Sequence, residues 1–146
     1  TLKEALQLQS QIQLCNPSPS SWGQGGFHTY WLNESNAWIV TQWSKAGREM
    51  VKICTKGIKK ESDIKMIKQA GRELLLCQSS DWSFILKAGT TTELARKRIN
   101  LHLKRFWILI NAIKDEENID HRFLEKIEKE DSIFPLISPL DWIKKI

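Results

Sequence analysis

The sequence predicts a mainly helical fold, a bundle of about four helices with a long loop rich in glycine and tryptophan near the N-terminus. Three observations predict it. Apolar residues recur at steps of three and four over most of the chain, no segment alternates convincingly as a strand would, and glycine, proline and serine gather in one early stretch. The chain of 146 residues has the size of one domain, so we expect 1–146 to form a single helical domain.

The first half of the chain predicts one short and one long helix. Residues 1–14 resemble a short polar helix, and the prolines at 17 and 19 end it because proline cannot continue a helix. The glycine-rich loop follows. Asn33 to Asn36 then offer capping side chains for a helix that we expect to end at Gly57. Its apolar stripe consists of Ile39, Trp43, Ala46, Met50 and Ile53.

The second half predicts three more helical segments and a tail. Ser62 or Asp63 is expected to cap a helix in which Gly71 allows close helix contact. A long helix is expected over roughly 92–114, and Asp120 caps a last short one. The tail from Ile133 contains two prolines and is expected to pack as an extended apolar strap.

Charge and cysteine content point to an ordinary intracellular protein. The net charge of +5 permits nucleic-acid binding, but the lysines are dispersed and are best interpreted as a solvated surface. We therefore rank nucleic acid last as a partner and expect no membrane contact, because no apolar run approaches about 20 residues. Three cysteines without CxxC spacing favour neither disulfides nor zinc, so we expect no metal and a reducing, cytoplasmic location.

The tryptophans are the candidate binding residues. Seven in this chain is a large excess. Trp38, Trp43 and Trp107 fall in helical patterns and are expected in the core, whereas Trp22, Trp31 and Trp82 fall in loop-like contexts. The last three are the candidates for sugar binding, because indole rings offer apolar area at little entropic cost and match the apolar face of a sugar ring. The alternative is that Trp22 and Trp31 simply anchor the loop.

Catalytic residues are not predicted. Glycoside chemistry needs two carboxyl groups, and Asp81, within the segment QSSDW (78–82), is the only acid in a special-looking motif. Glu34 and Glu73 resemble capping or helix-surface residues without a partner. The glycine run follows no strand, so no dinucleotide cofactor is expected. Asp81 either contacts sugar hydroxyls or a neighbouring catalytic group, or it caps a turn.

His102 replaces an apolar residue on the stripe of the long helix and has two interpretations. It is either a core histidine that is hydrogen-bonded to a carbonyl or a carboxylate, or it faces the Asp81 motif together with Arg98 and orients it. Both interpretations place His102 inside the bundle, but only the second gives it a role in binding.

Several motifs together resemble one family. They are SSWGQGGF (20–27), WLN (31–33), RELLLCQSSDWSFI (72–85), ARKR (95–98) with His102 and Phe106, and the closing IFP (133–135). Over nearly the whole chain they resemble the C-terminal helical region of glycoside hydrolase family 57 α-1,4-glucan branching enzymes.

The resemblance implies a division of labour. Such enzymes join a (β/α)7 barrel, which carries the nucleophilic glutamate and the acid/base aspartate, to this helical region. The barrel would lie before residue 1, in the same polypeptide or in a partner. The resemblance assigns Trp22, Trp31, Asp81 and Trp82 to an α-glucan cleft, with Arg98 and His102 in support. A free-standing glucan-binding or interaction module from a split gene is the alternative.

Three residues depart from the family pattern. Gln24 replaces a usual acid, Phe27 a usual tyrosine, and Ser83 a usual proline. The first two remove a charge and a hydroxyl from the loop, which changes the glucan contacts expected there and leaves the tryptophans in place.

Overall fold

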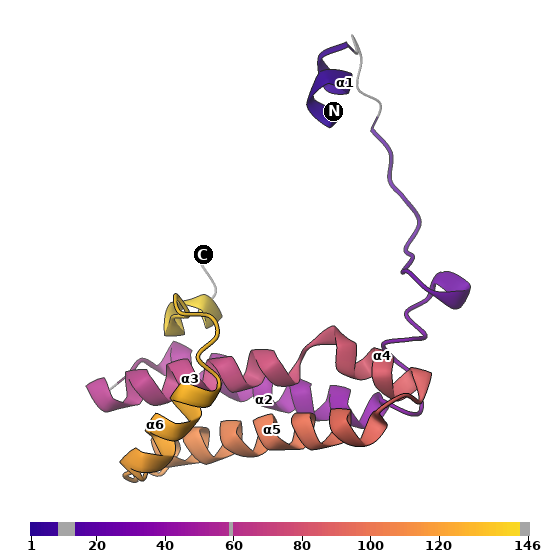
Figure 1. The fold of residues 1–146 in the computed structure, drawn as a ribbon. Coiled ribbons are helices and arrows are strands. Elements are labelled where there is room, and N and C mark those ends of the chain that lie inside the picture. The colour runs from indigo at the N-terminus through magenta and orange to yellow at the C-terminus, as the bar shows by residue number, and fades with distance from the viewer. Residues whose placement is uncertain (9–13, 59, 144–146) are drawn as a thin grey trace.

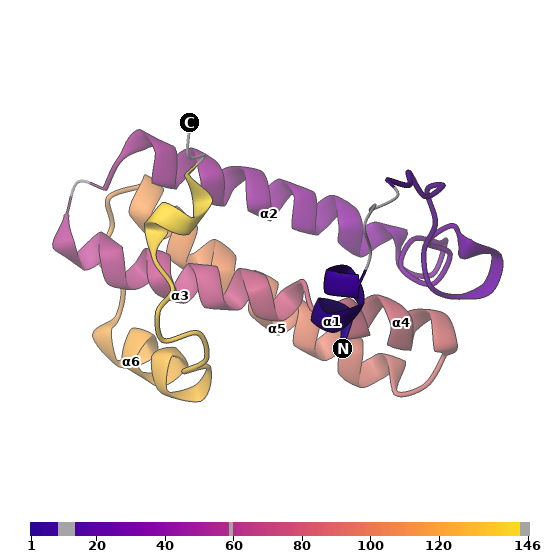
Figure 2. The ribbon, with the colours of Figure 1, turned by 90° about the horizontal axis from the view of Figure 1, so that it is seen from above.

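The structure is a computed structural model that describes residues 1–8, 14–58 and 60–143. Three long helices lie side by side and form its body, namely α2 (Ala37–Lys56), α3 (Glu61–Cys77) and α5 (Thr92–Lys114). Figure 2 shows the same three helices from above. The described residues contain no β-strand. The predicted mainly helical fold is therefore confirmed.

The apolar stripes meet between these helices. Phe106 and Leu109 of α5 are fully buried against α3, and Met50 of α2 is fully buried as well. The long helix spans the predicted residues, and Gly57 follows the end of α2 with φ 83°, a backbone conformation that glycine adopts readily. α3 begins at Glu61, slightly before the predicted cap, and the structure records no side-chain cap there.

A fourth helix, α4 (Ser80–Ala88), was not predicted as a separate element. The chain turns at Gln78 and Ser79, and Gly89 ends the helix in the left-handed conformation with φ 76°. α4 contacts α5 and continues the bundle beyond α3, as Figure 1 shows. The segment QSSDW therefore opens a helix rather than forming a loop.

The C-terminal part folds back over the bundle. Asp120 caps α6 (His121–Glu130) as predicted, because its carboxylate accepts a hydrogen bond from the backbone of Arg122 at 2.9 Å. Residues 132–143, which we call the strap, include the short 3-10 helix η2 (Pro139–Trp142). The strap crosses α3 to reach α2.

Gly71 makes room for this strap. A Cβ atom at Gly71 would lie 2.5 Å from the Trp142 ring and 3.0 Å from Ile137, both of which belong to the strap. The close approach predicted at Gly71 therefore exists, but its partner is the strap rather than a neighbouring helix.

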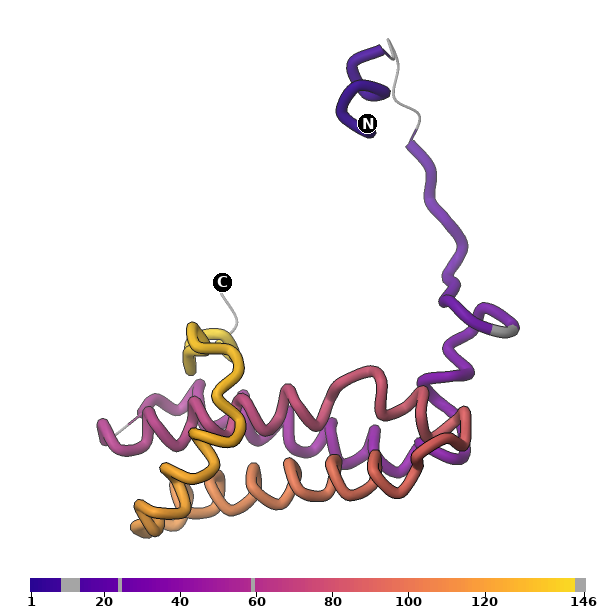
Figure 3. Tube along the Cα trace, in the orientation of Figure 1, coloured from indigo at the N-terminus to yellow at the C-terminus, as the bar shows by residue number. Residues whose placement is uncertain are grey.

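The N-terminal part stands away from the bundle. α1 (Leu2–Leu8) is separated from the body by an extended segment and then by the glycine-rich loop, as the trace in Figure 3 shows. The loop contains a short 3-10 turn, η1 (Gln24–Gly26). The predicted helix over 1–14 corresponds to α1 among the described residues, and residues 9–13 of that prediction lie outside the described part. Among all the described residues of the chain, no helix is both long and apolar enough to cross a membrane.

Candidate functional site: an aromatic cluster beside helix α4

Four aromatic rings gather where the glycine-rich loop meets α4. Tyr30 and Phe84 are stacked, with ring centroids 4.9 Å apart and planes inclined by 17°. Trp22 lies 6.0 Å from each of Tyr30, Trp31 and Phe84. We call these four residues the aromatic cluster. Such tilted and edge-on pairs are the arrangements that aromatic rings prefer.

The cluster is open to solvent. The Trp22 side chain is 70% exposed, and Trp31 and Tyr30 are partly exposed. Phe27, at the end of the glycine turn, is also exposed. The rings are therefore not sealed inside the helical core, and a ligand can reach them without unfolding the bundle.

The glycines of the loop permit its tight path. Gly23 has φ 103°, and a Cβ atom there would lie 3.0 Å from the Tyr30 ring. Gly25 has φ 78°, which side chains rarely adopt. The Ser21 backbone N–H donates to the Gly26 carbonyl at 2.7 Å and closes the turn. Gly23 thus allows the backbone to touch Tyr30 and keeps that ring in the cluster.

A buried amide fixes the loop to the bundle. Asn36 is fully buried, and its amide nitrogen donates to the backbone carbonyls of Tyr30 at 3.0 Å and Ser83 at 3.2 Å. Its side-chain oxygen accepts from the backbone of Asn33 at 2.8 Å. Ser83 and Phe84 are neighbours in α4, so this amide sets the distance between the two sides of the aromatic cluster. Asn36 flanks α2 as predicted, but its side chain makes these bonds instead of capping that helix.

Asp81 and Trp82 lie nearby but differ in accessibility. Asp81 is exposed in the first turn of α4. Trp82 is half-buried against the core, and its indole N–H donates to the Leu76 carbonyl at 2.8 Å. Because that donor is used within the protein, Trp82 offers a ligand less than Trp22 does. An open hollow of about 380 Å³ beside the loop is lined by Asn33, Glu34, Ser35 and Lys87.

Tyr30 and Phe84 were missed by the sequence analysis. Tyr30 is adjacent to Trp31 in the same loop. Phe84 lies three residues after Asp81, which is one helical turn, so recognising α4 as a helix would have placed it on the same side as the motif.

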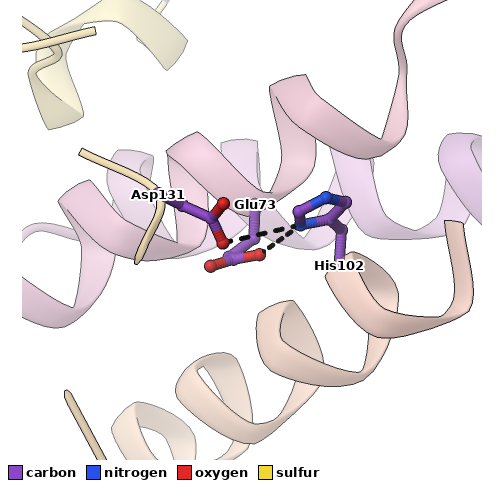
Figure 4. A group of neighbouring side chains, drawn as sticks. All are labelled: Glu73, His102 and Asp131. Carbon is purple, nitrogen blue, oxygen red and sulfur yellow. Dashed lines mark hydrogen bonds and ion pairs between the residues drawn. The ribbon is translucent and has the colours of Figure 1, made fainter. Parts of the chain in front are cut away.

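His102 takes part in a separate, buried group of charges, shown in Figure 4. Its Nδ1 atom lies 2.7 Å from Glu73 Oε2 and 3.9 Å from Asp131 Oδ2. The interpretation of His102 as a core histidine bonded to a carboxylate is therefore confirmed. Arg98 is exposed on α5, and neither residue bonds to Asp81 among the interactions of the described residues. Their supporting role remains a prediction.

The interpretation of Glu73 as a surface residue without a partner is wrong. Glu73 is fully buried, accepts a hydrogen bond from Gln69 at 2.9 Å, and meets His102. Arg105 lies 4.0 Å from Glu73 and donates to Asp131, which is half-buried. A histidine and two carboxylates could hold a cation, but the guanidinium of Arg105 already supplies the positive charge there. We therefore interpret this group as a structural ion network that joins α3, α5 and the end of α6.

Known proteins share the sequence and architecture of this chain. The model of the C-terminal domain of 1,4-alpha-glucan branching enzymes matches residues 42–142. A 1,4-alpha-glucan branching enzyme of Thermococcus kodakarensis is 32% identical over 118 residues, which are 78% of this chain and 18% of that enzyme. The chain thus spans less than a fifth of that relative.

Solved structures agree. The GH57-type branching enzyme of Pyrococcus horikoshii has a TM-score of 0.86 at 28% identity, over 99% of this chain and 28% of its own. The GH57 branching enzyme of Thermococcus kodakaraensis has a TM-score of 0.83 at 27% identity, and the match covers 100% of this chain and 28% of that enzyme's chain. An alpha-amylase of Thermotoga maritima has a TM-score of 0.79 at 29% identity, and the match covers 100% of this chain and 26% of the amylase chain. Since the family model covers more than half of the chain, this chain belongs to the C-terminal domain family of 1,4-alpha-glucan branching enzymes.

Proposed function

We propose that this chain serves as the helical part of a GH57 branching enzyme and that its aromatic cluster binds the α-glucan substrate beside a catalytic barrel. The enzyme would cut an α-1,4-glucan and rejoin the piece through an α-1,6 link. The observation that carries the proposal is the exposed Trp22 ring, held against Trp31 by a loop that the bundle fixes. A related branching enzyme was crystallised in complex with glucose, which supports a carbohydrate ligand.

The aromatic cluster suits an oligosaccharide better than a single sugar. Trp22 and Trp31 are inclined by 70°, so their faces do not form one flat surface, and a curved chain of glucose units can meet both. The exposed carboxylate of Asp81 and the side chains of the nearby hollow, such as Lys87, offer hydrogen-bond partners for hydroxyl groups. Apolar platforms with polar groups around them are typical of ligand sites.

We propose further that the chain does not turn over glucan alone. Among the described carboxylates, Glu73 is fully buried and engaged by His102, and a polysaccharide cannot reach it. Asp81 is exposed, as an acid that contacts substrate would be, but a glycosyl transfer needs two carboxyl groups. The nucleophile and the acid would come from the barrel.

Removal of the indole rings tests the binding role. A ring face that covers about 60 Å² of sugar contributes about 1.5 kcal/mol at about 25 cal/mol per Å², which is about tenfold in affinity. Trp22→Ala and Trp31→Ala should each weaken retention of the chain in glycogen-containing native gels by about that factor. Leu101→Ala, at an exposed leucine in the middle of α5 and outside the aromatic cluster, is the matched control and should change nothing. Unchanged retention of both tryptophan variants would refute the platform.

Assays of branching test the division of labour. The chain alone should leave the iodine staining of amylose unchanged, and the chain together with its barrel should lower it. Robust branching by the 146-residue chain alone would contradict the proposal. A free-standing glucan-binding module remains the second candidate, and it predicts full glycogen retention with no stimulation of any barrel.

A further inference from the structure

His28 is an exposed histidine of the glycine-rich loop, and its backbone is unusual. It has φ 61°, in the left-handed region that residues other than glycine seldom adopt. Residues in that region persist where surrounding contacts hold them, and they are concentrated at ligand sites and active sites. The conformation of His28 is therefore imposed by the loop around it.

Three hydrogen bonds of its backbone hold His28 between the two tryptophans of the aromatic cluster. Its N–H donates to the Ser21 hydroxyl at 2.5 Å. Its carbonyl accepts from the N–H groups of Trp31 and Leu32, both at 2.9 Å. Because Ser21 directly precedes Trp22, His28 is tied to the arm of the loop that carries Trp22 and to the arm that carries Trp31. The loop that positions both indole rings thus also fixes the backbone of His28.

The imidazole ring of His28 is not used within the described part of the protein. The structure records hydrogen bonds of the His28 backbone there but none of its ring. A neutral imidazole offers one N–H donor and one acceptor nitrogen. A sugar hydroxyl can likewise both donate and accept. The exposed ring therefore has the chemistry to bond to hydroxyl groups of a ligand beside the tryptophans.

The left-handed backbone alone does not require a histidine. Gly23, Gly25 and Gly26 of the same loop also have positive φ, which glycine adopts without steric cost. Histidine is tolerated in this region better than most residues, but it is still less favourable there than glycine. The turn gains nothing from the imidazole, so the contribution of the ring lies in a contact outside the protein.

We propose that His28 is a further glucan-contact residue, whose imidazole hydrogen-bonds to hydroxyl groups of a glucose unit that lies against Trp22 or Trp31. The proposal rests on the function proposed above. An apolar contact with an indole face is not directional, so a sugar can rotate on it. A hydrogen bond is directional, and one made from a fixed point of the loop sets the orientation of the sugar.

This contact gives the site a preference among glucans. The rings of Trp22 and Trp31 are inclined by 70°. A curved α-1,4-linked chain can meet both rings and His28 together, whereas a straight β-1,4-linked chain meets one ring and leaves the imidazole without a partner. A binding group left unpaired by the wrong ligand is a general source of specificity. His28 is therefore a specificity-determining residue of the proposed site.

An NMR titration of the 146-residue chain with maltoheptaose tests the contact directly. The imidazole resonances of His28 should shift with the same dissociation constant as the indole resonance of Trp22. His28→Gly removes the ring and keeps the left-handed backbone, so its affinity for maltoheptaose should fall about fivefold, as the loss of about one hydrogen bond predicts. The preference for maltoheptaose over cellohexaose should fall with it. An imidazole whose resonances stay unchanged at saturation would overturn the inference.

Glu116→Gly is the matched control for the change of backbone. Glu116 also has a left-handed φ, 55°, but it lies between α5 and α6, at the end of the bundle opposite α4 (Figure 1). This variant should bind maltoheptaose as the unaltered chain does, and equal losses in the two glycine variants would contradict the proposal. His28→Gly should unfold at the same or a higher urea concentration than the unaltered chain. A lower midpoint would assign the histidine to the fold instead of the ligand.

The same titrations separate this inference from the proposed function. If the unaltered chain binds no maltoheptaose, the glucan site is refuted together with the role of His28. If Trp22→Ala weakens binding and His28→Gly does not, only the role of His28 is refuted. Weaker binding by both variants, with a normal Glu116→Gly control, supports the glucan site and the role of His28 in it.

Discussion

Replacing Gly71 by alanine tests how the strap is held on the bundle. Gly71 is buried in α3, and a Cβ atom there would lie 2.5 Å from the Trp142 ring. Real side chains do not approach so closely, so either the strap shifts or the helix does. Ile137 adds a second contact at 3.0 Å.

The change in the free energy of unfolding expected for Gly71→Ala is the sum of two opposing contributions. Alanine in place of glycine inside a helix stabilises by about 1 kcal/mol. Overpacking of a filled site costs about 1–3 kcal/mol. Gly47 in α2 is the matched control, since a Cβ atom there would meet nothing within 4 Å. Gly47→Ala should therefore gain the helix term alone, and Gly71→Ala should have a free energy of unfolding about 1–3 kcal/mol below that of Gly47→Ala.

Urea unfolding followed by circular dichroism measures the difference. The double variant Gly71→Ala with Trp142→Ala removes the clash. Its loss of free energy of unfolding should be smaller than the sum of the losses of the two single variants, because the two sites are in contact. If Gly71→Ala were as stable as Gly47→Ala, the strap would not lie in the notch at Gly71, and the reasoning would be refuted.

Three further predictions concern buried polar groups and thiols. His102→Leu leaves the carboxylate of Glu73 without its 2.7 Å partner and should lower the free energy of unfolding by about 3–5 kcal/mol, measured by urea unfolding; a loss below 1 kcal/mol would contradict the ion network. Asn36→Ala removes the amide that holds the loop, so stability should fall by about 1–3 kcal/mol, and glycogen retention should fall although no ring is altered. Burial raises the pKa of the Cys77 thiol to about 12, so at pH 8 iodoacetamide should modify the exposed Cys15 in the native chain and Cys77 only after unfolding or at much higher pH, as mass spectrometry would show.

The long elements could be predicted from local signals. The helix over 92–114 has six turns of regular apolar periodicity, and its ends follow from that pattern and the threonines before it. Gly57 and Asp120 mark helix ends through conformations and hydrogen bonds that depend on a few neighbouring residues. Signals of this kind are legible because both partners lie within one or two turns.

The aromatic cluster could be predicted only in part. Trp22 and Trp31 stood out by residue type and by the glycines beside them. Tyr30 and Phe84 did not, because their stack joins residues 54 positions apart and depends on α4, whose nine residues give too short a periodic pattern. Which rings meet is a property of the folded bundle.

The burial of Glu73 could not be predicted from the sequence for the same reason, because it depends on residues that are distant along the chain. Its neighbours in the sequence favour a helix surface, and a lone carboxylate in a core is costly. The cost is offset because α5 brings His102 and Arg105, and α3 itself brings Gln69. Two of these partners lie about 30 residues away, so no local pattern reveals that the position is buried.

The buried polar residues lie where irregular segments join the helices. Asn36 joins the loop to α4, and the bonds of Glu73 and His102 meet Asp131 at the point where α6 ends and the strap begins. Apolar stripes specify which helix faces meet, but they are tolerant of where a loop or strap attaches. Directional bonds are not tolerant, because a displaced segment would leave a buried group unpaired. We therefore attribute the positions of the aromatic cluster and of the strap to these few polar contacts, and the stability of the bundle between them to its apolar core.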